Sequence, residues 1–529
     1  MLRKAFVSSA LLLVQRCLAA IGPVADLVIS NQDVSPDGFT RGAVVAGGTT
    51  IGPLIVGSKG DTFKLNVINQ LNDNTMLQST SISKSLMKLS SIGTASSRKT
   101  VHGQMVLRLL PNAQSRKGIV SFINSMFQIK PERFGTILTS YCDGLRGAIV
   151  VYDPLDPYRL LYDIDNESTV ITLADWYHAK AKTLLFPTPD TTLINGLGRW
   201  SQGTNTPLTV ISVVWGKRYR IRVANIACDP AYTFWIDDHN MNIIEVDAVN
   251  VVPKVADSFK IYAGQRYSFV LNAIRPVGNY WIRADPNLGV SGFANGINSA
   301  ILRYVGAPNA EPAASTFTPS NLLQESQVIP LSLVGAPGIP GVGNADVNIN
   351  LNFAFNGNLK FTVNGVEFVN PTMPVLLQIM SGAQPANNLL PTGSVYSLPA
   401  NKVVEISMPG GLLGIEHTFD VVRVAGSSTY NYINPVTTID TQTSANSHSS
   451  FQIRRDVVNI GGPNDNVTIR FRTDNPGPWF LHCHIDWHLE AGFAVVFAER
   501  TSEWTTSINP PVAWDNLCPK YDSMSPGDL

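Results

Sequence analysis

The stretch His482-Cys483-His484-Ile485-Asp486-Trp487-His488-Leu489-Glu490-Ala491-Gly492-Phe493 holds three histidines and a cysteine close together. In an extended segment successive side chains point to opposite faces, so Cys483 faces one side and His482 and His484 face the other. One short segment can then touch two metal centres, because Cys483 and His488 can hold one ion while the flanking histidines reach ions on the other side. A soft thiolate with imidazoles is typical of blue-copper sites, which usually add a weak axial ligand.

The spacing His-Cys-His-x3-His-x4-Phe resembles the fourth copper motif of multicopper oxidases, and most of all that of basidiomycete-type fungal laccases. The resemblance implies that Cys483 and His488 bind the type 1 copper, and that His482 and His484 bind the type 3 pair. Phe493 falls at the axial place, where a side chain that cannot coordinate favours a high potential. A zinc site, or a cluster of buried polar side chains prone to oxidation, is the alternative for the same residues.

The N-terminus predicts secretion. In the chain of 529 residues, the positive start Met1-Leu2-Arg3-Lys4 is followed by an apolar run and small residues up to Ala20. This pattern is typical of a secretory signal peptide, here residues 1–20, and no later apolar run is long enough to cross a bilayer. We therefore expect a secreted, extracellular protein, glycosylated at the sequons of Asn166 and Asn466, that is a monomer and does not bind membranes.

An internal repeat indicates the architecture. Gly60–Asn69 matches Gly216–Asn225 position by position, and Val467–Arg472 is a looser third copy. Each copy alternates apolar and polar residues, as a strand packed on one face does. The sequence predicts an all-β protein of three tandem Greek-key β-sandwiches, and the resemblance makes them cupredoxin-like (plastocyanin-like) domains. Proline-rich junctions place these domains at residues 21–152, 153–310 and 311–529.

The five cysteines do not pair completely. Cys17 leaves with the signal peptide and Cys483 is a candidate metal ligand, so an odd number remains in an oxidising compartment. The resemblance implies a disulfide between Cys142 and Cys228. The partner of Cys518 stays open.

The histidine count is too low for a complete laccase site. The resemblance requires ten histidines and one cysteine for four copper ions, but the chain has eight histidines. The histidines outside the motif show no ligand pairing and are interpreted as structural: His102, His178, His239, His417 and His448. The first two copper motifs of laccases, His-Trp-His-Gly and Trp-Tyr-His-Ser-His, are absent from Ser83–Ser140.

Ser83–Ser140 also differs in composition, with nine Lys or Arg residues and one Glu. A basic run can bind anions, but this one lacks the interleaved aromatic residues of a nucleic-acid site, and we expect no nucleic-acid partner. Codons read from the third base of Phe134 permit Trp-Tyr-His-Ser-His-Leu, and the same offset from Ser91 permits His-Trp-His-Gly. We interpret the stretch as frameshifted, through a gene-model or splicing error or a lesion in the gene, which predicts damage to the first sandwich.

A second gap lies at Gly414–His417. Laccases carry His-Pro-Phe-His-Leu-His-Gly-His-Thr-Phe-Asp here, and this chain carries Gly-Ile-Glu-His-Thr-Phe-Asp. We align His417 with the last histidine of that pattern, which is not a ligand. Three ligand histidines, one of them for the type 1 copper, are then lost by a deletion.

The resemblance implies one-electron oxidation of phenols or aromatic amines at the edge of His488, coupled to reduction of O2 to water, as in lignin or phenolic turnover. Asp229 falls where laccases place the carboxylate that receives the phenol proton, although an aspartate before Pro230 is as readily a turn residue. With so few ligands, we expect the chain as written to be inactive. Two alternatives stay open: a cupredoxin-fold paralogue without catalysis that has a binding or structural role, and another multicopper oxidase such as a ferroxidase.

Overall fold

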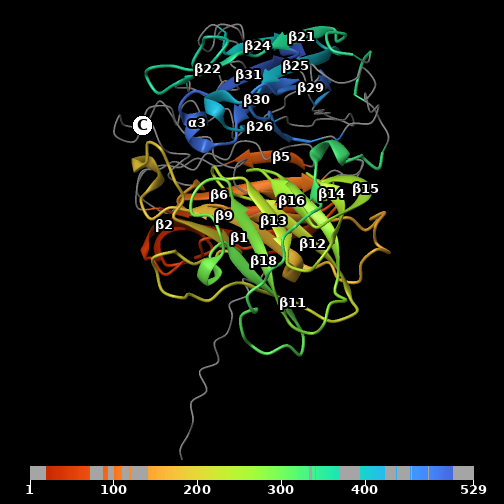
Figure 1. Cartoon of the computed structure of the whole chain (residues 1–529). Coiled ribbons are helices and arrows are strands. Elements are labelled where there is room, and N and C mark those ends of the chain that lie inside the picture. The colour runs from red at the N-terminus through yellow and green to blue at the C-terminus, as the bar shows by residue number, and fades with distance from the viewer. Residues whose placement is uncertain are drawn as a thin grey trace, which may run out of the picture.

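The structure is a computed structural model, and it describes residues 20–71, 87–92, 101–109, 118–121, 141–332, 336–339, 341–369, 393–422, 436–437, 453, 455–474 and 476–503. These residues form seven sheets and few helical turns, which confirms the predicted all-β class (Figure 1). No helix within the described ranges is long and apolar enough to span a membrane. The predicted signal peptide, apart from Ala20, lies outside the described residues, as do Cys518 and His448.

The N-terminal part of the chain forms two sheets. One has the order β2-β1-β4-β6-β5 and the other the order β3-β8-β7. Their strands are β1 (Val24–Val34), β2 (Arg41–Ala46), β3 (Ile55–Ser58), β4 (Thr62–Gln70), β5 (Met87–Ile92), β6 (Val101–Leu109), β7 (Gly118–Ser121) and β8 (Ala148–Tyr152). Strands β5, β6 and β7 belong to the stretch that we interpret as frameshifted. Most of that stretch lies outside the described residues, so the frameshift stays a hypothesis.

The middle of the chain forms a pair of six-stranded sheets, with the orders β10-β9-β12-β17-β14-β15 and β11-β19-β18-β13-β16-β20. Their strands are β9 (Val170–Trp176), β10 (Thr191–Ile194), β11 (Val210–Val213), β12 (Arg218–Asn225), β13 (Tyr232–Ile236), β14 (Met241–Val246), β15 (Val249–Ala256), β16 (Ser258–Ile261), β17 (Arg266–Asn272), β18 (Asn279–Pro286), β19 (Ser299–Tyr304) and β20 (Leu322–Leu323). A continuous core, which includes Phe234, Phe259 and Phe269, fills the space between these sheets. Strand β20 pairs with β16, so the chain returns to this sandwich after the proline-rich junction.

The C-terminal part forms the sheets β21-β25-β29-β27, β22-β23 and β24-β31-β30-β26-β28. Their strands are β21 (Val347–Asn350), β22 (Phe353–Phe355), β23 (Phe361–Val363), β24 (Val395–Leu398), β25 (Val403–Pro409), β26 (Thr418–Val422), β27 (Val436–Thr437), β28 (Val457–Asn459), β29 (Asn466–Arg472), β30 (Gly477–Cys483) and β31 (Ala494–Glu499). One short α-helix, α3 (Asp486–Glu490), follows β30. The 3-10 turns are η1 (Glu167–Thr169), η2 (Ala181–Thr183), η3 (Ala294–Gly296), η4 (Glu325–Gln327), η6 (Leu412–Gly414) and η7 (Thr501–Glu503).

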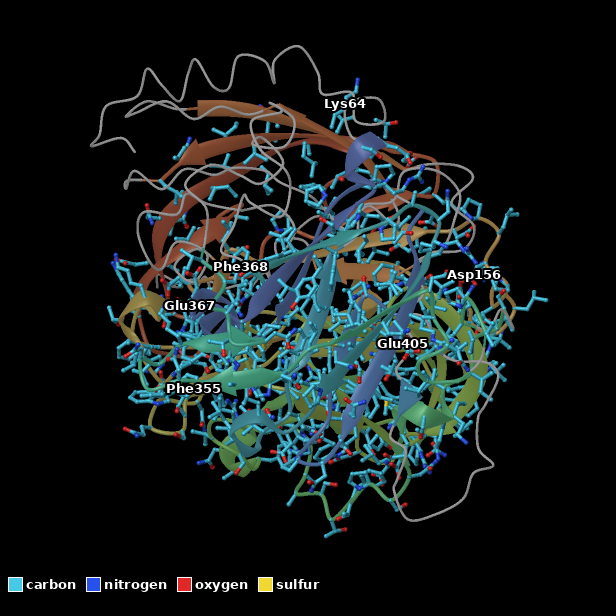
Figure 2. All side chains as sticks on the ribbon, turned by 90° about the horizontal axis from the view of Figure 1, so that it is seen from above. Lys64, Asp156, Phe355, Glu367, Phe368 and Glu405 are labelled. Atoms are coloured by element: carbon cyan, nitrogen blue, oxygen red, sulfur yellow. A yellow bond between two sulfur atoms is a disulfide. The ribbon has the colours of Figure 1, made fainter. Side chains whose placement is uncertain are left out.

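The internal repeat corresponds to one strand in each part of the molecule. Its three copies form β4, β12 and β29, and each lies inside a different sheet, as predicted. The apolar positions are buried in the copies on β12 and β29, and in the copy on β4 Phe63 and Leu65 are buried while Val67 is half-buried. On β12 the alternating polar positions are buried as well, and Arg220 forms ion pairs with Asp156 and Glu245. Figure 2 labels Asp156 among the side chains drawn on the ribbon. The repeat therefore marks core strands, while the exact domain limits stay predictions.

Buried ion pairs join the middle and C-terminal sandwiches. Arg266 on β17 binds Asp456 through Nη1 to Oδ1 at 2.8 Å, and Arg455 binds Asp247 through Nε to Oδ2 at 2.6 Å. Removing one partner of such a pair leaves an uncompensated buried charge, which typically costs about 3–5 kcal/mol. The C-terminal sandwich, drawn in blue at the top of Figure 1, is thereby fixed against its neighbour.

Candidate metal centre

Strand β30 and helix α3 bring the cysteine, the last histidine and the phenylalanine of the motif together. After Cys483 the chain turns through α3 and returns, so that Phe493 N donates to His488 O at 2.9 Å and Cys483 N donates to Phe493 O at 3.0 Å. The return requires Gly492, which has a φ of +96° and whose added Cβ would lie 2.6 Å from the Glu367 side chain. A residue with a side chain would be strained there. Local backbone geometry therefore sets the spacing between Cys483, His488 and Phe493.

The Cys483 thiol and the His488 imidazole are placed to share one ion. Cys483 Sγ lies 3.6 Å from His488 Nδ1. Two ligands of a tetrahedral ion, with bonds of about 2.3 Å to sulfur and about 2.0 Å to nitrogen, lie about 3.5 Å apart. Cys483 is fully buried, whereas His488 is partly exposed. The pair therefore fits the first two ligands of a metal centre that is reached from the surface through the histidine.

Phenylalanine rings enclose this pair. The ring of Phe361 lies 4.5 Å from that of His488 and stacks on Phe493 at 4.7 Å. Phe419 packs edge-on against Phe493 at 4.9 Å. An apolar sheath of this kind controls water access and local dielectric, and hence the redox potential of a bound metal. Phe493 lies at the predicted axial place and offers no ligand atom.

The protonation of the site follows from its burial. Burial raises the pKa of the Cys483 thiol well above its ordinary value, and the nearby carboxyl of Asp229 raises it further. Burial lowers the pKa of His488 to about 3, and the ring of His417 adds to this shift. The imidazole is therefore neutral, which is the form that binds metals, while the thiol must lose its proton to a metal when one binds.

His417 lies beside this pair, although the sequence interpretation assigned it no ligand role. It is fully buried immediately before β26, and its ring centroid is 5.0 Å from that of His488 and 5.6 Å from that of Phe493. Burial lowers its pKa to about 4, so its ring too is neutral. One signal could have revealed this position: His417 precedes Phe419 by two residues, which places both on one face of an extended segment.

The opposite side of β30 holds only two of the expected ligands. His482 and His484 are buried, and burial lowers their pKa values to about 4 and about 3. His484 packs against the backbone of Gly264, where an added Cβ would lie 2.4 Å from its Nε2. Within the described ranges no further His, Cys, Asp or Glu completes a three-ligand group here. The described residues on this side do not fit a centre of three copper ions.

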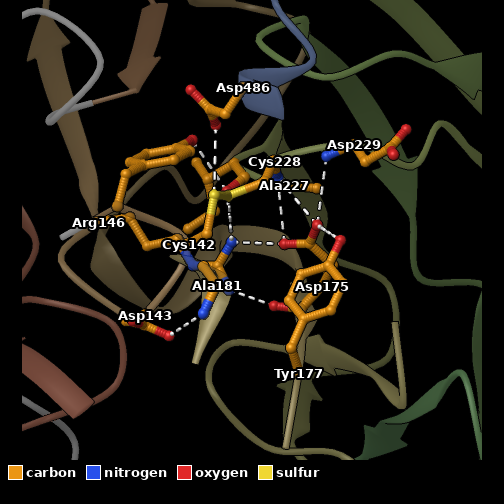
Figure 3. The surroundings of a disulfide bond; sticks show 12 residues. Cys142, Asp143, Arg146, Asp175, Tyr177, Ala181, Ala227, Cys228, Asp229 and Asp486 are labelled. Atoms are coloured by element: carbon orange, nitrogen blue, oxygen red, sulfur yellow. Dashed lines mark hydrogen bonds and ion pairs between the residues drawn. A yellow bond between two sulfur atoms is a disulfide. The ribbon is translucent and has the colours of Figure 1, made fainter. Parts of the chain in front are cut away.

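One group of three potential ligand atoms does occur in the described part of the chain, but it is a disulfide site. Cys142 and Cys228 are covalently joined, with their Cα atoms 5.8 Å apart, as the resemblance implied. The carboxyl of Asp486 lies beside this bond, 3.5 Å from Cys142 Sγ. Since both sulfurs are used in the disulfide, the group is not a metal site. Figure 3 shows that the disulfide lies directly below α3, which carries Asp486.

Asp229 follows the disulfide and is a half-buried residue beside the buried Asp175. Its backbone N donates to Asp175 Oδ2 at 3.2 Å, and Asp175 binds Arg146 at 2.6 Å (Figure 3). Burial, helped by the charge of Asp175, raises the pKa of Asp229 to about 7. Its neighbour Cys228 accepts a hydrogen bond through its carbonyl oxygen from Asp486 N at 3.2 Å, which places the segment beside α3. A carboxyl with a pKa near 7 is suited to accept a proton at neutral pH.

Two stretches of the chain, residues 167–307 and 368–503, match family models described as multicopper oxidase. The chain is 52% identical to the laccase of Phlebia radiata, covering 97% of this chain and 96% of that one. It is also 52% identical to laccase-1 of Pleurotus ostreatus, covering 96% and 95%. Among solved structures, the laccase from Botrytis aclada superposes with a TM-score of 0.75 at 24% identity, covering 96% of this chain and 94% of that one. A multicopper oxidase that functions in iron import superposes with a TM-score of 0.71 at 20% identity, covering 95% of each chain.

Proposed function

The chain belongs to the multicopper oxidase family, whose cofactor is copper, and we propose that it is a laccase-type protein that takes single electrons from phenols or aromatic amines. The observation that supports this most directly is the pairing of Cys483 Sγ with His488 Nδ1 at 3.6 Å inside a phenylalanine sheath. A copper ion bound there supplies a one-electron acceptor.

Different residues have different roles in the oxidation of the donor. The partly exposed ring of His488 provides the contact with the aromatic donor. Asp229 receives the proton that a phenol loses on oxidation, because its raised pKa of about 7 leaves it able to bind one. The phenylalanines Phe361, Phe419 and Phe493 keep water away from the sulfur.

We further propose that the chain as sequenced does not reduce O2 to water. Reduction of O2 to two waters takes four electrons, for which the family uses a cluster of three copper ions. Here His482 and His484 lack further ligands within the described residues, and the chain has only eight histidines in total. This supports, as the second candidate, a paralogue that has lost turnover and keeps a redox or structural role.

Copper-loaded protein with this sequence tests both statements. A phenol such as 2,6-dimethoxyphenol, added without oxygen, is expected to be oxidised once per copper and then no further. With air present, an oxygen electrode is expected to record no sustained O2 consumption. Four copper ions per chain with continuous turnover would contradict the proposed loss, and a copper-loaded chain that oxidises no phenol at all would contradict the laccase-type assignment.

We also propose that the protein is secreted and acts as a monomer outside the cell. The N-terminal pattern of residues 1–20 supports secretion, and so does the Cys142–Cys228 disulfide, since disulfides persist in oxidising compartments. Protein recovered from the culture medium is expected to begin at Ile21 on N-terminal sequencing. Retention of the full N-terminus inside the cell would contradict this.

A further inference from the structure

We propose that one end of the middle sandwich is a docking surface for a polymer of phenolic rings that carries scattered carboxylates. The surface, called the Trp215 patch, consists of the exposed side chains of Val214, Trp215, Ile274, Val277 and Val305. The choice of a phenolic partner rests on the proposed function, whereas the surface itself rests on the structure. Binding to the polymer is measured without copper and without turnover, so it is tested independently of the proposed function.

Large apolar side chains gather at this end of the sandwich. The exposed fraction is 60% for Trp215, 65% for Ile274 and 60% for Val305. Val277 lies beside Val305, because a Cβ added to the next residue, Gly306, would be 3.6 Å from Val277 Cγ1. Single exposed apolar side chains are ordinary, but a contiguous group often marks a binding site. Tryptophan is also enriched among the residues that dominate binding energy.

Hydrogen bonds between neighbouring turns make the group contiguous. Gly216 N, next to Trp215 in the turn after β11, donates to Ala273 O after the end of β17 at 2.7 Å. Val305 N, after the end of β19, donates to Val213 O at the end of β11 at 2.8 Å. The turns after β11, β17 and β19 therefore lie side by side and present one surface.

Most of the charges around this surface are balanced. Arg218 binds Asp163 through Nη2 to Oδ1 at 2.8 Å. Burial raises the pKa of Tyr280, and Asp238 and Arg275 add contributions of opposite sign, so one acid and one base lie together on that side. These two pairs cancel, and neither gives the surface a net charge.

Lys217 supplies one positive charge in excess. It is exposed in the same turn as Trp215, and it forms no ion pair within the described residues. A lysine beside an indole can bind a carboxylate while the indole stacks on an aromatic ring. The partner that fits is therefore rich in aromatic rings and carries occasional acid groups, as an oxidised phenolic polymer does.

Two other occupants fit this surface less well. Recruitment to an anionic membrane takes a cluster of about four to eight Lys or Arg side chains, and this surface has one in excess. A stable contact with a second copy takes about 20 to 30 residues a side. A two-fold contact would also bring the Lys217 side chains of both copies together, because the same patch faces itself.

This end of the molecule lies opposite the candidate metal centre. The strand label β11 is near the bottom of Figure 1, whereas α3 and β30 belong to the C-terminal sandwich at the top. A polymer docked on the Trp215 patch therefore leaves the His488 ring open to smaller phenolic donors. Docking then holds the protein close to its donors and does not compete with them.

Binding isotherms of the metal-free full chain on suspended kraft lignin, a phenolic polymer with carboxylates, test the surface. Trp215→Ser is expected to weaken binding by about 10-fold or more. Trp215→Phe is expected to retain most of the affinity, because it keeps an aromatic face. Lys217→Gln is expected to weaken binding by about 2-fold to 5-fold at low salt and to make it less sensitive to added NaCl.

Ile339→Ser is the matched control. It removes an apolar side chain that is 69% exposed beside β29 of the C-terminal sandwich, and its binding to the polymer is expected to equal that of the unchanged protein. All four substitutions are at exposed positions, so the melting temperatures are expected to stay the same. Cellulose, which has no aromatic rings, is expected to bind none of these proteins through the patch.

Equal polymer binding by Trp215→Ser and the unchanged protein would overturn the inference, as would an unchanged protein that does not bind the polymer. Tighter binding to vesicles of phosphatidylcholine and phosphatidylserine would overturn it in favour of a membrane. A dimer in sedimentation equilibrium that Trp215→Ser dissociates would overturn it in favour of a second copy. Polymer binding that depends on Trp215, in a protein whose copper-loaded form oxidises no phenol, would overturn only the proposed function.

Discussion

The two faces of β30 differ in how completely they are built. On one face Cys483, His488 and His417 gather inside a phenylalanine sheath, with 3.6 Å between the sulfur and the His488 Nδ1 atom. On the other face His484 lies against Gly264 of the middle sandwich, where an added Cβ would come within 2.4 Å of its ring, and His482 packs on Phe480 at 4.9 Å. Both faces come from the same short stretch of sequence.

The difference shows which of the two faces is built from residues of one sandwich. The Cys483 face draws Cys483 and His488 from β30 and α3 and His417 from the residue before β26, all in the C-terminal sandwich. By the resemblance to laccases, the opposite face needs ligands from a distant part of the chain, and we interpret the segments that would supply them as altered. On the proposed function, a lesion far away in the sequence would remove oxygen reduction and leave the electron-accepting centre in place.

Restoring the distant segments should produce the largest effect. Residues 83–140 and the shortened loop at Gly414–His417 can be exchanged for the matching segments of the Phlebia radiata laccase. We expect the resulting chain to consume O2 with phenols. Turnover should enter the ordinary enzyme range of about 1 to 10³ per second, and bound copper should rise to four ions per chain. Oxygen-electrode and metal measurements check this.

Each exchange made alone provides the control for that chimera. A chain with only one segment restored still lacks ligands for the His482 and His484 face, so it should remain without steady O2 consumption. Turnover from either single exchange would show that the opposite face needs fewer ligands than we infer.

The next largest effect should come from proton transfer at the Cys483 face. The rate of phenol oxidation should change by about 10-fold with pH. The pKa of Asp229 is about 7, so its carboxyl gains the ability to accept a proton as the pH rises through that value. Phenol oxidation by the copper-loaded protein should therefore accelerate from about pH 6 to about pH 8. Asp229→Asn should lose this acceleration, and it should differ little from the unchanged protein at about pH 5.

Ferrocyanide is the control donor, because it gives up an electron without a proton. Its oxidation should show no difference between Asp229→Asn and the unchanged protein across that pH range. If both variants oxidise phenol with the same pH profile, Asp229 is the turn residue that its position before Pro230 also allows.

The same group affects stability with a defined sign. Native Asp229 keeps its proton up to about pH 7, whereas in the unfolded chain it ionises near its ordinary pKa of about 4. The native state thus binds more protons between these values, so this contribution to stability declines as the pH rises from about 4 to about 7. The free energy of unfolding of Asp229→Asn, measured with urea, should fall less over this pH range than that of the unchanged protein.

The smallest effect should be the loss of folding stability caused by tighter packing on the opposite face. Gly264→Ala places a Cβ within 2.4 Å of the His484 ring at a φ of +80°, and Gly216→Ala makes the same change at a φ of +81° with no atom within 4 Å. Both substitutions place an alanine in the left-handed region, which lowers the stability by about 1–2 kcal/mol. We expect urea unfolding to show Gly264→Ala to be the less stable by a further 1–2 kcal/mol or so. Equal losses would mean that this face is more open than the structure shows.

Much of this protein follows from its sequence. The three copies of the apolar and polar alternation predict core strands, and β4, β12 and β29 confirm them because a strand buried on one face requires that period. The spacing between Cys483, His488 and Phe493 predicts their meeting, since one helical turn and a glycine return the chain on itself. The shortage of histidines is a matter of counting alone.

Other features were decided only by the tertiary structure. Sequence alignment makes His417 a non-ligand and says nothing of its neighbours, and the pairing of β26 with β30 is what places its ring 5.0 Å from that of His488. The pKa of Asp229 depends on burial beside Asp175, which lies on β9, far from Asp229 in the sequence. Local spacing fixes contacts within one turn of the chain, whereas contacts between strands depend on register, and burial depends on everything that packs around a side chain.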